Sequence, residues 1–131
     1  MKKKLLVAAL LFGFAAEPCY ARSGFDEAAR LYAVVGFQFA YISYTDTAVN
    51  TTDTNALNSL VLSFYAHYYM SLAIQTNNRD LWNQAQQFAT QAAQFSQQSY
   101  AATGDVYSYY AQIFLQVSAQ YAQQAFQQWT P

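Results

Sequence analysis

Residues 81–95, LWNQAQQFATQAAQF, carry the clearest periodicity in the chain. Their apolar side chains recur every three or four residues, at Leu81, Ala85, Phe88, Ala92 and Phe95. Glutamines fill the other side of the stretch and continue to Gln98. This spacing places apolar residues on one face of an α-helix and polar residues on the opposite face. The stretch therefore predicts an amphipathic helix whose glutamine face meets water.

The next segment repeats this design after the short turn AATGD (101–105). We expect six of its residues to face inward: Val106, Tyr110, Ile113, Phe114, Val117 and Tyr121. Its polar edge consists of Gln112, Gln116, Gln120, Gln123 and Gln127. Gly104 suits a helix that ends in the left-handed conformation, and Asp105 suits the cap of the next helix. Two amphipathic helices joined by so short a turn are expected to pack antiparallel.

Turn-forming residues gather in two further stretches, TDTAVNTTDTN (45–55) and QTNNRD (75–80). They divide the chain into four segments, each preceded by a plausible N-cap: Ser23, Asp53 or Thr54, Asn78, and Asp105. The predicted helices lie near 24–44, 54–75, 79–101 and 105–129. We expect an all-α, antiparallel up-down-up-down four-helix bundle. A chain of this length buries one core, which predicts a single helical domain over 22–131.

The N-terminal stretch MKKKLLVAALLFGFAAEPCYA has the layout of a secretory signal peptide over 1–21. Three lysines precede an apolar run that is too short to span a bilayer, and a small-residue pair, Cys19 and Ala21, follows it. Cleavage is expected after Ala21, with Ala15 as the alternative. The protein is then exported to the periplasm or the extracellular space. The mature chain has no cysteine, so it is not a disulfide scaffold.

Charged residues are scarce, and beyond Ala21 three arginines stand against six acidic residues. From Leu81 to Pro131 the only charged residue is Asp105. Binding to nucleic acid or to anionic lipid needs clustered Lys and Arg, so neither is expected. Residues 54–78 carry no charge, but Asn58, Ser63 and other polar residues interrupt them. No membrane span is therefore expected in the mature chain, and a spanning hairpin of the first two segments is the less favoured alternative.

The stretch SFYAHYYMSLAI (63–74) contains His67, the only histidine of the chain. A zinc site needs three or four ligands, and Met70 lies on the same helix face, where it cannot complete an axial haem pair. We interpret His67 as a boundary residue that hydrogen-bonds a neighbouring Ser or Tyr. The adjacent acids Asp26 and Glu27 are typical of a helix first turn. No catalytic residue, metal ligand or cofactor is therefore predicted, and the protein is expected not to be an enzyme.

The first two segments are apolar on nearly all sides. In the second segment the main stripe, expected to face the core, is Leu57, Val61, Phe64, Tyr68 and Leu72. A helix with two apolar faces needs a cover for both. The favoured hypothesis is self-association, or association with another exported protein, through these two segments. The alternative is a carrier that holds an apolar or aromatic ligand in the bundle interior. The candidate interaction residues for either role are Tyr32, Val34, Phe37, Tyr41, Tyr44, Tyr65, Tyr68 and Tyr69.

Overall fold

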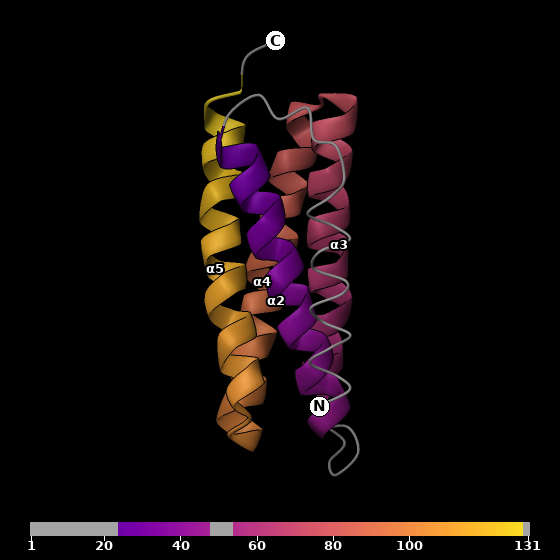
Figure 1. Cartoon of the computed structure of the whole chain (residues 1–131), viewed down its shortest axis with the longest axis vertical. Coiled ribbons are helices and arrows are strands. Elements are labelled where there is room, and N and C mark those ends of the chain that lie inside the picture. The colour runs from indigo at the N-terminus through magenta and orange to yellow at the C-terminus, as the bar shows by residue number, and fades with distance from the viewer. Residues whose placement is uncertain (1–23, 48–53, 130–131) are drawn as a thin grey trace.

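The computed structural model describes residues 24–47 and 54–129, which form a bundle of α-helices (Figure 1). Its elements are α2 (Gly24–Thr47), α3 (Thr54–Thr76), α4 (Arg79–Thr103) and α5 (Val106–Gln127). They run alternately up and down, so the predicted four-helix bundle is confirmed, with every helix end within one turn of its expected place. The proposed signal peptide at 1–21 and the candidate caps Ser23 and Asp53 lie outside the described residues.

Each helix packs against two adjacent helices and lies diagonally opposite the remaining one. The most extensive contacts join α2 to α5, α3 to α4 and α4 to α5, and α2 also packs on α3. The diagonal pairs, α2 with α4 and α3 with α5, barely touch. In Figure 1, α5 and α3 accordingly stand on opposite sides of the bundle.

The turns between α3, α4 and α5 have the chemistry that the sequence predicts. The Asn78 carboxamide oxygen accepts a hydrogen bond from the Asp80 N–H at 3.0 Å, and the Asp105 carboxylate accepts one from the Tyr107 N–H at 3.0 Å. Gly104 has a φ of 71°, and its N–H donates to the Tyr100 carbonyl at 2.8 Å. These bonds satisfy backbone groups that a helix end leaves unpaired.

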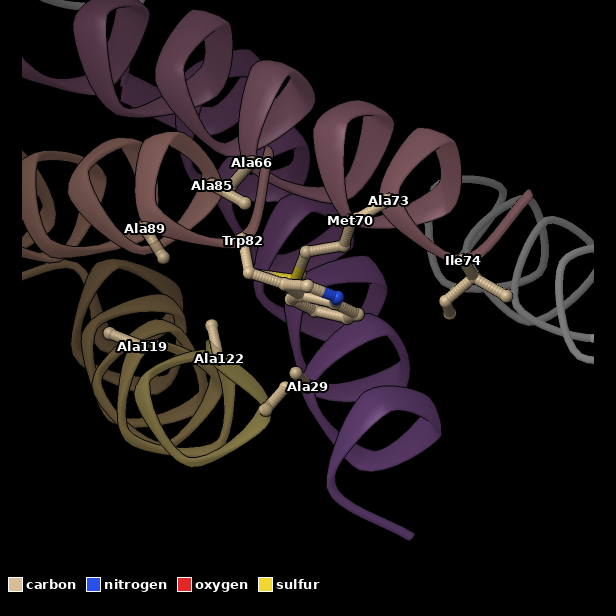
Figure 2. Packing of buried hydrophobic residues seen from close by; sticks show 12 residues of the cluster. Ala29, Ala66, Met70, Ala73, Ile74, Trp82, Ala85, Ala89, Ala119 and Ala122 are labelled. Atoms are coloured by element: carbon tan, nitrogen blue, oxygen red, sulfur yellow. The ribbon is translucent and has the colours of Figure 1, made fainter. Parts of the chain in front are cut away.

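The core is built mainly from small side chains. Figure 2 shows the Trp82 ring beside the Met70 side chain, with Ala29 and Ala122 on neighbouring helices. Each helix contributes buried alanines, and buried serines bridge helices: Ser118 donates to the Ala29 carbonyl at 2.8 Å, and Ser59 bonds Ser96. Small side chains let helix axes come close together, so stability depends on close packing rather than on large aliphatic groups.

The expected inward stripes are wrong in α3 and in the first turns of α5. In α3 the predicted core residues Leu57, Val61, Phe64 and Tyr68 are exposed, and in α5 so are Val106, Tyr110 and Ile113. The predicted stripe of α4 does face inward, with Ala85 and Ala92 fully buried and its larger residues half-buried, and Trp82 is buried as well. The faces that do point inward are rich in Ala and Ser. Helices that are apolar on several sides can bury either face, and this bundle buries the face that allows the closest approach.

Candidate functional site

The outward face of α3 carries a continuous row of exposed apolar side chains, which we name the α3 patch. It consists of Leu57, Val61, Phe64, Tyr65 and Tyr68. Their exposed fractions run from 41% at Leu57 to 47% at Tyr68. The spacing of three and four residues keeps them on one side of the helix, opposite the buried Ala66, Met70 and Ala73. The patch therefore points directly away from the bundle axis.

Ring contacts hold the aromatic part of the α3 patch in place. The Phe64 ring stacks against that of Tyr68 with 6.1 Å between centroids, and it meets the Tyr65 ring edge-on at 5.9 Å. Beneath the patch, Phe64 packs on Phe37 of α2 at 6.0 Å. Side chains already ordered in this way lose little rotamer freedom when another surface covers them. The aromatic side chains of the patch are thus ordered by contacts within the chain itself.

The candidate residues from the sequence fall into two groups. Tyr65 and Tyr68 are exposed and belong to the α3 patch. Others are engaged within the bundle: Tyr32 packs between the rings of Phe114 and Tyr121, Phe37 contacts His67, and Tyr69 stacks on Phe88. Tyr41 and Tyr44 are half-buried and Val34 is fully buried. The open surface therefore belongs to α3 rather than to α2.

Sequence reasoning assigned Leu57, Val61 and Phe64 to the core and so missed them as surface residues. The signal that identifies them lies on the opposite side of the same helix. Small residues recur there every three or four positions, at Ala56, Ser59, Ser63 and Ala66, and Ala73 follows two turns later. Such a series suits a close helix contact, so it points inward and leaves the larger residues outside.

His67 is buried rather than at a boundary. The rings of Phe37 and Phe64 close around it, with centroids 5.1 Å and 5.2 Å from the imidazole. Burial, with a smaller contribution from the positive charge of Arg30, lowers the pKa of His67 from 6.5 to about 4. Arg30 is itself buried and pairs with the Glu27 carboxylate at 2.8 Å. The imidazole is therefore neutral at pH 7 and packs between two aromatic rings.

Within 24–47 and 54–129, no group of three or more His, Cys, Asp or Glu side chains is placed to hold a metal ion. None of the helices in these ranges has a stretch apolar and long enough to cross a bilayer.

A groove of about 400 Å³ runs along the surface between α4 and α5. Its floor includes Ala93 and Ala119, and its polar lining consists of Thr90 and six glutamines: Gln86, Gln94, Gln97, Gln116, Gln120 and Gln123. Amide groups both donate and accept hydrogen bonds but do not titrate. This groove is polar and uncharged, so it differs from the apolar interior that a carrier of aromatic ligands would need.

The described surface thus combines exposed aromatic rings with uncharged amides. Groups of these kinds bind by burying apolar area and by forming hydrogen bonds. Comparisons with protein-family models, with curated proteins and with solved structures found no match to this chain.

Proposed function

We propose that this chain is an exported, non-enzymatic structural protein that associates with further copies of itself through the α3 patch. The observation that carries the proposal is the run of five large apolar side chains on the outward face of a helix without charge. Export is supported by the signal-like sequence at 1–21. A non-catalytic role is supported by the enclosure of the chain's single histidine between Phe37 and Phe64.

The size of the α3 patch suits a protein partner. A fully exposed large side chain offers roughly 150–250 Å², so exposures of 41–47% leave about 400 Å² of side-chain surface open. Patches of this extent on a monomer are often functional. A stable interface covers about 800 Å² on each partner, so the patch supplies about half and polar neighbours such as Asn58 would form the rim.

A second copy is the partner that the charge distribution favours. No Asp, Glu, Lys or Arg occurs from Thr54 to Asn78, so copies meeting along α3 bring no like charges together. Proteins that must stay monomeric place charges on such faces, and this helix places none. Tyr65 and Tyr68 add hydroxyl groups at the edge of an apolar surface, a combination enriched at interfaces.

The second candidate, a carrier of an apolar or aromatic ligand, has weaker support. Its ligand would occupy the bundle interior, but Trp82, Met70 and Leu115 fill that space together with alanines from all four helices. The groove between α4 and α5 has room, but its glutamine lining suits a polar ligand.

The test is native mass spectrometry combined with light scattering on protein purified after expression of the full coding sequence. We expect wild type to form multimers at micromolar concentration and Tyr68→Lys to be monomeric. Gln91→Lys is the matched control, because it adds the same charge at an exposed position on α4. Far-UV circular dichroism verifies that both variants fold. A wild type that stays monomeric at every concentration would refute self-association, and a constant extra mass on that monomer would favour the carrier. The intact mass also shows whether residues 1–21 have been removed.

A further inference from the structure

A second exposed apolar surface lies at the turn between α4 and α5, and we name it the α5 patch. It consists of Tyr100, Val106, Tyr109, Tyr110 and Ile113. Their exposed fractions run from 39% at Ile113 to 45% at Val106, close to those of the α3 patch. The Tyr109 ring lies 5.3 Å from that of Tyr100 and 6.1 Å from that of Tyr110. Further along α5, the outward face becomes polar, with Gln116, Gln120 and Gln123.

The two patches point in opposite directions from the same end of the bundle. α3 and α5 are diagonal partners, and each patch lies on the side of its helix opposite the buried residues. The two helices run parallel in the up-down-up-down order, so their first residues lie at the same end (Figure 1). The α3 patch occupies the first two-thirds of α3, and the α5 patch occupies the first turns of α5 with the last turn of α4.

We propose that the α3 patch of one copy docks on the α5 patch of the next copy, with the two bundles side by side and parallel. This inference rests on the proposed self-association and specifies its geometry. Parallel docking buries both patches of every internal copy, about 400 Å² on each side of each contact. Pairing two α3 patches about a twofold axis would instead leave both α5 patches in water.

Opposed patches have a consequence for the size of the assembly. An assembly built from a repeated head-to-tail contact closes into a ring only if the rotation between successive copies brings the last copy back to the first. Otherwise the assembly extends as an open chain of copies. Surfaces that point in opposite directions cannot close on two copies, so the expected product is an open row or a large ring. The charges near the two patches permit this contact. Helix α3 has no charged residue, and residues 100–113, which contain the α5 patch, include only Asp105.

Complementation between two variants tests the geometry. Tyr68→Lys disrupts the α3 patch and leaves the α5 patch intact, and Ile113→Lys does the reverse. We expect wild type to give a concentration-dependent series of masses beyond the dimer and each variant alone to be monomeric. An equal mixture of the two variants should form a 1:1 heterodimer and nothing larger, because it contains one intact patch of each kind. Gln91→Lys should assemble like wild type.

The alternatives give different results in the same experiment. If Ile113→Lys alone still forms a dimer and the mixture forms no heterodimer, the contact joins two α3 patches. The head-to-tail inference then fails while self-association stands. If wild type is monomeric, or if both variants assemble as wild type does, the proposed use of these patches fails altogether. Circular dichroism of each variant separates loss of docking from loss of folding.

Discussion

Replacing Gly36 by alanine should weaken the bundle, because the new methyl group meets Leu115 of α5. A Cβ at position 36 would lie 2.6 Å from the Leu115 Cγ and 2.8 Å from its Cδ2, with the Leu115 backbone nitrogen at 3.4 Å. Leu115 is fully buried, so its side chain has little room to move aside. Overpacking of this kind costs ~1–3 kcal/mol. Alanine recovers ~1 kcal/mol through its better helix propensity. We expect a net loss of ~1 kcal/mol of unfolding free energy, within a range of ~0–2 kcal/mol.

The measurement is urea unfolding at one fixed protein concentration, since self-association would add stability of its own. The fluorescence of Trp82, whose side chain is only 1% exposed, and far-UV circular dichroism both report the transition. With a urea dependence of ~1–3 kcal/mol per molar for a domain of this size, a loss of ~1 kcal/mol should lower the midpoint by about 0.3–1 M.

Two companion variants make the reasoning refutable. Gly24→Ala is the matched control, because a Cβ there meets no heavy atom within 4 Å, and it should not lower stability. Leu115→Ala alone should cost ~2–5 kcal/mol by leaving a cavity. In that background Gly36→Ala should become stabilising, because the obstructing side chain is gone. If Gly36→Ala is as stable as Gly24→Ala, or if its effect does not change sign when Leu115 is removed, the close contact is not what governs this position.

Three further predictions concern stability. The pKa of His67 is lowered to about 4, so between pH 6.5 and pH 4 the unfolded chain binds a proton that the folded chain does not, and the free energy of unfolding falls as the pH drops through that window. In urea titrations, wild type should lose about 3 kcal/mol more of this free energy than His67→Leu between pH 7 and pH 4. Equal losses in the two proteins would contradict this. Gly104→Ala should lower the free energy of unfolding by ~1–2 kcal/mol, because alanine is strained at the φ of 71° that Gly104 adopts. Gly104→Asn should lower it by less, and thermal unfolding of the two variants compares them. Trp82→Ala should lower the free energy of unfolding by ~3–5 kcal/mol, and Trp82→Phe should lower it by less, as measured by unfolding followed with circular dichroism. A loss below ~1 kcal/mol for Trp82→Ala would contradict the place of Trp82 in the core.

The number of helices, their ends and their antiparallel order were accessible from the sequence because they depend on local signals. Asn78, Gly104 and Asp105 terminate or start helices through bonds to residues two to four positions away. The glutamines of α4 also lie where the period of the helix places them, most of them in water.

Which face of each helix points inward was not accessible in the same way. In α3 a stripe of Leu, Val, Phe and Tyr competes with a stripe of Ala and Ser, and hydrophobicity alone favours the larger residues. The choice is made by the neighbouring helix, since Ala85, Ala89 and Ala92 of α4 present an equally small surface. Two small faces pack at close range, so the series of small residues in α3 becomes decisive only when it is considered together with the facing series in α4. The same reasoning explains why the exposed surface of α3 contains residues assigned to the core.

The pairing of α2 with α5 has a consequence for the order in which the protein folds. Synthesis delivers the chain N-terminus first, so α2 emerges before any of its neighbours. Its most extensive partner is α5, the last of the described helices to be made. The face of α2 that holds Ala29 and Gly36 therefore stays uncovered until α5 has been synthesised. A bundle whose first and last helices pair with each other stays open longer during synthesis than one in which each helix pairs only with the helix before it.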